Sequence, residues 1–127
     1  MKKFTFLIIL ILLVGCSPKD ESPENQSIIG TWKLVEEYGS YGAAGSWKSV
    51  GDGHQIVISE ENIIQSDLYS CVGDYQLESD NQISIEFDCS EAKFSLDYNY
   101  KLEGDNLILS VISGCDEGCA EKFKRPR

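Results

Sequence analysis

Residues 94–102 alternate strictly between apolar and polar side chains, and few architectures accommodate such a segment. They read Phe-Ser-Leu-Asp-Tyr-Asn-Tyr-Lys-Leu, with an apolar or aromatic side chain at every second position. Successive side chains of a β-strand point to opposite faces of a sheet, so only an extended strand sorts this pattern into one apolar and one polar face. We therefore expect a strand with one buried side, followed by a tight turn at Gly104-Asp105 and a returning strand.

Shorter runs of the same kind, separated by turn residues, fill the chain from Ile28 onward, and no helical period interrupts them. Eight or nine short strands with hairpin-length links predict an all-β, antiparallel up-and-down barrel, because closure removes exposed sheet edges. The glycine-rich residues 39–46 predict a long mobile loop that covers one end of the barrel. The expected strands span about 29–38, 46–50, 54–59, 62–67, 70–78, 82–88, 93–102, 106–113 and 119–125.

The register of one hairpin predicts a disulfide. The segment 75–83 repeats the local pattern of 100–108, which indicates a reused hairpin with a turn at 79–81 and a left-handed Asn81. Pairing the apolar residues of its two strands, Leu77 with Ile83 and Tyr75 with Ile85, brings Gly73 opposite Phe87 and Cys71 opposite Cys89. We predict a Cys71–Cys89 disulfide.

A second cysteine pair brackets a short loop. Cys115 and Cys119 enclose three residues, with Gly118 at a position that favours positive φ, and a hairpin neck would bring the two sulfurs together. Pairing of Cys71 or Cys89 with Cys115 remains open, because sequence does not fix connectivity. The spacings of the four cysteines do not form two CxxC knuckles, so we disfavour zinc and expect no metal.

The N-terminus predicts export and a lipid anchor. Lys2 and Lys3 precede an apolar run over 4–14, which is too short for a membrane-spanning helix, and Gly15 precedes Cys16. Leu13-Val14-Gly15-Cys16 resembles a bacterial lipobox. This predicts a signal peptide over 1–15, a lipidated Cys16 with a flexible polar tether over 16–27, and one domain over 28–127.

The localisation expected from these segments is the cell envelope. Ser17 after the cysteine is compatible with sorting to an outer membrane. Lys19-Asp20-Glu21 resembles a sorting signal that sends some lipoproteins to the cell surface, with a generic charged linker as the alternative.

The net charge of the chain restricts the classes of partner that it can bind. The full sequence has a formal charge of −10, and loss of 1–15 removes two lysines and no acid, which leaves −12. Such a charge argues against nucleic acid and against electrostatic docking on an anionic membrane, so membrane attachment depends on the lipid anchor. No protein partner is identified by the sequence.

Three motifs in order resemble a known family. Ile29-Gly30-Thr31-Trp32 resembles the Gly-x-Trp signature on the first strand of lipocalins. With Leu102-Glu-Gly-Asp-Asn-Leu107 and Cys119-Ala-Glu-Lys-Phe-Lys-Arg125, the chain resembles the small lipocalin-like, calycin-type lipoproteins of Bacteroidetes. The resemblance implies a barrel with Gly30, Trp32 and Arg125 as its structural signature, in which Arg125 lies over Trp32 as a structural cation–π contact.

The titratable residues suggest no reaction centre. His54 is the only histidine and follows a Gly-Asp-Gly turn, so we expect a surface or loop position. The acids fall in predicted turns or on outward strand positions, where we expect a solvated face. We therefore expect a non-catalytic protein without a cofactor.

The barrel interior is the remaining candidate site. Two functions from different classes stay open: a binding protein for a small hydrophobic or amphipathic ligand, with Tyr75, Phe87, Tyr98 and Tyr100 as candidate contacts, or a solid barrel that meets a protein or glycan at the cell surface. The residues expected to point inward are Leu34, Ile56, Ile58, Tyr75, Ile85, Phe87, Leu96, Tyr98, Tyr100, Leu109 and Val111.

Overall fold

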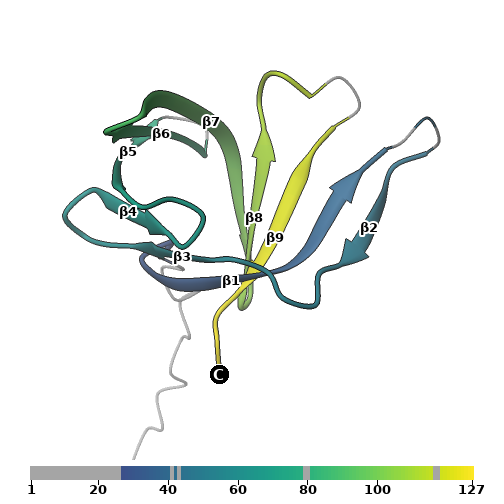
Figure 1. Ribbon diagram of the computed structural model, residues 1–127. Helices are drawn as coiled ribbons and strands as arrows, with labels where there is room; N and C mark the ends of the chain where they lie inside the picture. Colours follow the sequence, from purple (N-terminus) through teal and green to yellow (C-terminus); the bar gives the residue numbers. More distant parts are fainter. Residues whose placement is uncertain (1–26, 41, 43, 79–80, 116–117) are drawn as a thin grey trace, which may run out of the picture.

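A computed structural model describes residues 27–40, 42, 44–78, 81–115 and 118–127 (Figure 1). The signal, lipidation and tether predicted over 1–26, including Cys16, lie outside the described residues. Nine strands form the domain: β1 (Gly30–Gly39), β2 (Ser46–Ser49), β3 (Gln55–Ile58), β4 (Ile63–Ser66), β5 (Val72–Glu78), β6 (Gln82–Cys89), β7 (Ala92–Glu103), β8 (Asn106–Val111) and β9 (Ala120–Lys124). No helix in the described part of the chain is long and apolar enough to cross a membrane.

The strands close into an antiparallel barrel, which confirms the predicted fold class. The order runs β1-β3-β4-β5-β6-β7-β8-β9, and pairing of β9 with β1 closes the ring. β2 lies outside this ring of eight and pairs along the far half of β1. Each predicted strand is present, with bounds within a few residues. On β7, the strand with the clearest alternation, every second side chain from Phe94 to Leu102 is partly buried and those between are exposed.

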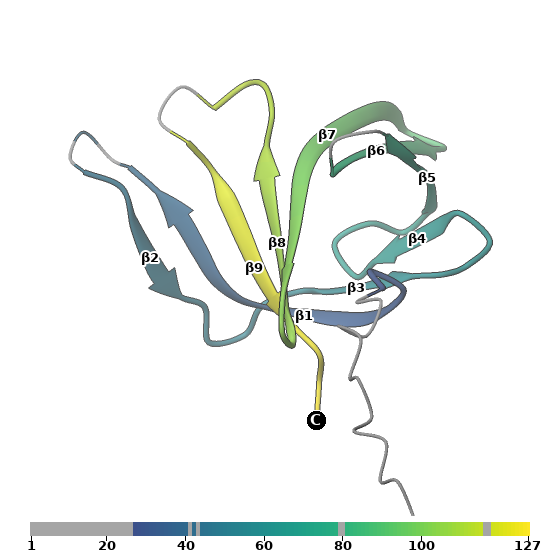
Figure 2. The same ribbon diagram turned by 180° about the vertical axis from the view of Figure 1, so that it is seen from behind.

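β1 is bent by a bulge and therefore has three neighbours. Its first half, from Gly30 to Lys33, pairs with β3, and its second half, from Glu36 to Gly39, pairs with β2. The other edge pairs with β9, where the register shifts between Leu34 and Glu36. A bulge inserts one residue and bends the strand. The second half of β1 consequently diverges from β3 together with β2, β8 and β9 (Figures 1 and 2).

One end of the barrel is closed by packed side chains around Trp32. This side chain is fully buried, its Nε1 donates to the Ile28 carbonyl at 2.7 Å, and the Arg125 guanidinium carbon lies 4.1 Å from its ring centroid. Arg125 also donates to the carbonyls of Ser27, at 2.7 Å, and Ile29, at 3.1 Å. The predicted contact between Arg125 and Trp32 is thus present, and it fixes the first described residues to the last strand's end.

The glycine of the Gly-x-Trp motif has a steric reason to be there. Gly30 has a φ of 134°, which side-chain-bearing residues rarely adopt, and a Cβ built on it would overlap Nη1 of Arg125. The absence of a side chain at Gly30 therefore lets the arginine reach the indole of Trp32.

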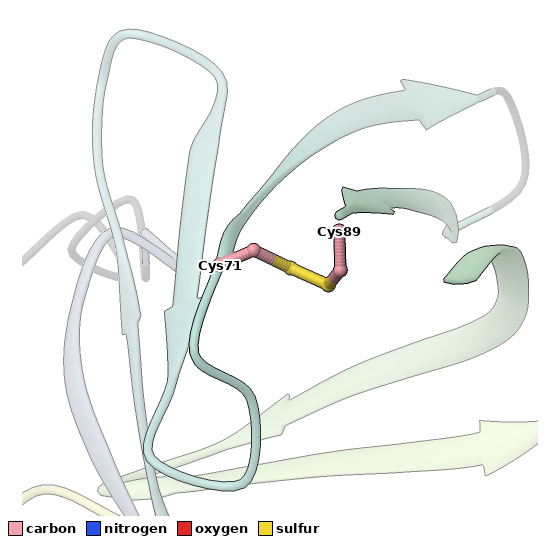
Figure 3. The surroundings of a disulfide bond; sticks show 2 residues. All are labelled: Cys71 and Cys89. Carbon is pink, nitrogen blue, oxygen red and sulfur yellow. A yellow bond between two sulfur atoms is a disulfide. The ribbon is translucent and has the colours of Figure 1, made fainter. Parts of the chain in front are cut away.

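The β5–β6 hairpin has the predicted register and disulfide. Leu77 pairs with Ile83 and Gly73 with Phe87, and Asn81 adopts a left-handed φ of 59°. Cys71, just before β5, bonds to Cys89 at the end of β6, with Cα atoms 5.4 Å apart (Figure 3). The Cys71–Cys89 prediction is confirmed.

The second disulfide, Cys115–Cys119, lies in the β8–β9 connection, with Cα atoms 5.9 Å apart and Gly118 at a φ of 76°. This pairing is also confirmed. β8 ends on the side of the molecule opposite the C-terminus (Figure 1), and the disulfide follows β8 in the chain. Gly39 and Ser40, from the glycine-rich β1–β2 link, line a cavity at the same end.

Candidate functional site

A small cavity of about 70 Å³ lies inside the barrel, away from Trp32. Its walls are mostly apolar, and five side chains with polar groups, His54, Ser66, Tyr69, Tyr98 and Glu121, also line it. Such a volume holds a few water molecules or one small functional group. The apolar wall comes from β3, β4 and β6–β9: Ile56, Ile64, Ile85, Phe87, Leu96, Leu109 and Phe123.

A wider cavity of about 330 Å³ adjoins the small one at the open end of the barrel. Tyr98 and Glu121 line both spaces, and we call the place where these two side chains border both cavities the neck. The outer wall includes Val111, the Cys115–Cys119 bridge and the ends of β1 and β2 with Glu37 and Lys48. Together the two spaces reach the lower end of the range for small-molecule sites, about 300–1,000 Å³.

Glu121 corrects the expectation that the acids face solvent. It pairs with the buried Leu109 on one side and precedes the buried Phe123 by two residues, so the strand alternation turns it inward. On the other side it lies directly opposite Glu37 across the β1–β9 ladder. Burial, and secondarily the charge of Glu37, raises the pKa of the Glu121 carboxyl.

Tyr98 presents a neutral phenol to the same neck. Burial, followed by the charges of Glu121 and Tyr69, raises its pKa to about 12. A phenol that keeps its proton offers one donor and a weak acceptor to a ligand. No hydrogen bond joins this hydroxyl to another side chain or backbone group of the described residues.

His54 lies in a loop, which is one of the two positions expected for it. This loop precedes β3, and the His54 ring is partly buried in the inner cavity, edge-on to Phe123 with centroids 5.4 Å apart. Burial lowers the pKa of His54, and the carboxylates of Asp67 and Glu37 oppose that effect in part. The imidazole is consequently neutral at neutral pH and serves as a hydrogen-bonding group of the cavity.

The β4–β5 loop, residues 67–71, covers part of the opening. Tyr69 packs against Phe87 and Phe94, with ring centroids 4.7 Å and 5.1 Å away, and Leu68 lines the inner cavity while staying 58% exposed. The Cys71–Cys89 disulfide ties the end of this loop to β6 (Figure 3). The loop therefore forms an anchored edge of the cavity, with an exposed leucine at the entrance.

Two of the four predicted ligand contacts line the cavities and two do not. Phe87 and Tyr98 line the inner space. Tyr75 is buried in the core, where its hydroxyl donates to the Ser59 carbonyl at 2.6 Å, and Tyr100 is partly buried on β7; neither lines the inner or the outer space. We carry only Phe87 and Tyr98 forward.

The other predicted inward positions agree with the structure. Leu34, Ile56, Ile58, Ile85 and Leu109 are buried, and Leu96 and Val111 are partly buried. Leu77, in contrast, is half exposed although its partner Ile83 is buried.

Sequence reasoning missed Glu121, His54 and Tyr69. A signal existed for Glu121, since two-residue spacing from Phe123 places it on the inner face. His54 and Tyr69 lie in loops, where no period indicates a direction. In the part of the chain that the structure describes, no three His, Cys, Asp or Glu side chains gather in a group that could hold a metal ion.

Comparison with known proteins found no relative. A scan against protein-family models and searches of curated proteins and of solved structures each gave no match.

Proposed function

We propose that this protein is a lipid-anchored, non-catalytic binding protein of the cell envelope that holds a small amphipathic molecule at the open end of its barrel. The observation that carries the proposal is the pair of neighbouring cavities of about 70 Å³ and 330 Å³, which share Tyr98 and Glu121 in their walls. Apolar walls with a few convergent polar groups are typical of small-molecule sites.

The two cavities suit different parts of such a molecule. The inner cavity is small and carries the polar groups of His54, Ser66, Tyr69, Tyr98 and Glu121, which favours a compact polar head. The outer cavity has Val111, Ala120 and the Cys115–Cys119 bridge on its wall, which favours an apolar body. A molecule with its head inward and its body toward the opening would contact both.

An N-terminal anchor would orient the opening. Arg125 holds Ser27 and Ile29 at the closed end, where the described chain begins, and the cavities lie at the other end. A lipid on Cys16 would therefore tether the protein at its closed end, and the cavities at the other end would stay accessible to a diffusing molecule. The 11 residues from 17 to 27 reach at most about 35–40 Å when extended.

Native mass spectrometry of the full chain purified from its own host tests the proposal. We expect a co-purifying small molecule, and we expect it to be lost from Val111→Trp, which fills the outer cavity. Ile112→Trp is the matched control, because Ile112 is the next residue, is exposed and does not line that cavity. Circular dichroism of both variants checks that each retains the fold.

Absence of any bound molecule in the wild type, together with no ligand density in a crystal structure of that preparation, would contradict the proposal. It would favour instead the alternative of a solid barrel that contacts a protein or glycan.

A further inference from the structure

We infer that the ligand carries a cationic head, a protonated amine or amidine, that is bound at the neck between the two cavities by Glu121 and Tyr98. This inference rests on the proposed function, since it specifies the charge of the molecule that the cavities hold. It is argued from the side chains at the neck and from the absence of a cation that pairs with Glu121 among the described residues.

The first argument is the position of two carboxylates. Glu37 and Glu121 lie directly opposite each other in the β1–β9 ladder, and both line the outer cavity. Like charges at directly opposite positions destabilise a sheet. A monovalent cation between them would turn this repulsion into attraction on both sides.

The second argument is the missing partner of Glu121. No hydrogen bond or ion pair joins its carboxylate to another described residue, and its surroundings are partly buried. Lys122, the next residue along β9, points to the opposite face of the strand and pairs with Glu36. A partly buried carboxylate without a cation is costly, so the fold leaves open the place that a cation would fill.

The remaining charged groups around the neck do not fill that place. No lysine or arginine of the described residues lines the inner cavity. Lys48, which lies opposite Glu37 in the β1–β2 ladder, lines only the outer cavity, where it makes interactions of its own. The imidazole of His54 is neutral at neutral pH, and Asp67 adds a further negative charge beside it. Tyr98 contributes a phenol oxygen that can accept a hydrogen bond from an ammonium group, and a π face.

The size of the inner cavity fits a head of this kind. A space of about 70 Å³ admits an ammonium or a small amidine and excludes a bulky polar group such as a sugar. The apolar remainder of the molecule would lie against Val111 and the Cys115–Cys119 bridge. The same geometry disfavours fatty acids, because their carboxylate would meet Glu121 and Glu37.

Isothermal titration of the full chain with three probes of matched shape tests the charge: 2-phenylethylamine, 2-phenylethanol and phenylacetate. At pH 7.5 we expect the amine to bind at least about tenfold more tightly than the alcohol, as a charge-assisted hydrogen bond provides, and phenylacetate not to bind. Glu121→Gln should weaken the amine by about tenfold and leave the alcohol within about twofold.

Glu36→Gln is the matched control, because Glu36 lies on the same strand pair and faces outward toward Lys122. It should leave the amine affinity unchanged. The amine affinity should also fall as the pH drops through the pKa of Glu121, whose carboxylate must be ionised to hold the cation. A thermal unfolding curve for each variant checks the fold.

The outcomes separate this inference from the proposed function. Equal binding of amine and alcohol, with no effect of Glu121→Gln, would overturn the cationic head and leave ligand binding standing. If no probe binds, the molecule that co-purifies from the host decides: one without a protonatable nitrogen overturns the inference, and one with a basic head supports it. No co-purifying molecule at all overturns the proposed function, and the inference with it.

Discussion

Two pairs of polar side chains, Trp32 with Arg125 at the closed end of the barrel and Glu121 with Tyr98 at the open end, are partnered in opposite ways. At the closed end, the indole of Trp32 and the guanidinium of Arg125 have hydrogen-bond acceptors on the backbone of residues 27–29 and lie against each other. At the open end, Glu121 and Tyr98 share a partly buried neck without such partners, and a cavity remains. Satisfied polar groups and close packing stabilise a fold, whereas unpaired ones are retained where they serve a site.

The contrast shows that the residues of the two ends have different roles. The Trp32 and Arg125 side chains of the closed end stabilise the fold. The Glu121 and Tyr98 side chains of the open end have no hydrogen-bonding partner among the described residues, and they lie near two connections that are held by disulfides, the β4–β5 loop and the β8–β9 hairpin. Substitutions at the two ends should therefore differ in the sign of their effect on stability as well as in its size.

The largest effect should come from the tryptophan of the closed end. Trp32→Ala removes a fully buried side chain, and we expect a loss of about 3–5 kcal/mol in the free energy of unfolding. Trp47→Ala is the control, because Trp47 is 37% exposed on β2 and contacts only Tyr38 and Lys122 among the aromatic and cation contacts described. Urea unfolding followed by circular dichroism measures both.

If Trp32→Ala does not fold, Trp32→Phe retains part of the buried surface and gives a measurable, smaller loss. Equal losses for the Trp32 and Trp47 variants would remove the distinction between a packed closed end and a peripheral β2.

The next largest effect should be the loss of stability on removal of a disulfide, and this loss should differ between the two disulfides. Replacing both Cys71 and Cys89 by serine opens a closure of 18 residues, and the chain-entropy relation gives about 3 kcal/mol. The same change at Cys115 and Cys119 opens a closure of four residues, for which the relation gives about 2 kcal/mol. Urea midpoints of the two double variants, each against the wild type, measure the difference.

The disulfide comparison also sharpens the account of the open end. The chain-entropy relation acts through the unfolded chain, so it predicts the larger loss for the longer closure however Tyr69 packs against Phe87 and Phe94 in the folded state. A larger loss for the Cys115–Cys119 variant would contradict this account and mean that contacts in the folded state decide the difference.

The smallest effect should be an increase in stability, caused by Glu121→Gln, and its size should depend on pH. The raised pKa of Glu121 means that the folded chain holds this proton more tightly than the unfolded chain does. Stability is therefore lost as the pH rises from the ordinary glutamate value of 4.5 through the raised one, and the full penalty remains above it. Glu121→Gln should raise the melting temperature at pH 7 and have little effect at pH 3.

Glu36→Gln serves again as the control and should not stabilise the protein, because it breaks the contact with Lys122. A lower melting temperature for Glu121→Gln at pH 7, with no bound ligand present, would mean that the carboxylate has a stabilising partner. The open end would then resemble the closed one.

Periodicity and local turn chemistry account for the parts of the fold that could be predicted from the sequence. Alternation over 94–102 defines β7, and matching the apolar residues of neighbouring strands gives the β5–β6 register, from which Cys71–Cys89 follows. Gly118 and Asn81 take the positive φ values that their turns require. These features depend on residues near one another along the chain or across one hairpin, where a two-residue period determines the facing side.

The candidate site was predictable only in part. Phe87 and Tyr98 follow from strand alternation and line the cavity, and Glu121 would have followed from its spacing to Phe123. His54 and Tyr69 could not be predicted, because each enters the cavity from a loop. The direction of a loop side chain depends on what packs against it, here Phe123 for His54 and the pair Phe87 and Phe94 for Tyr69.

The sequence alone therefore determined an acidic chain whose strands alternate, pair in hairpins and are joined by two cysteine bridges. The tertiary structure decided the rest: the bulge after Leu34, the departure of β2 from the ring, the meeting of Glu37 with Glu121 and the two cavities. The physical reason is the range of the interactions. Strand faces and hairpin registers are local, whereas closure of β9 on β1 joins residues some 90 positions apart and depends on how the whole ring packs.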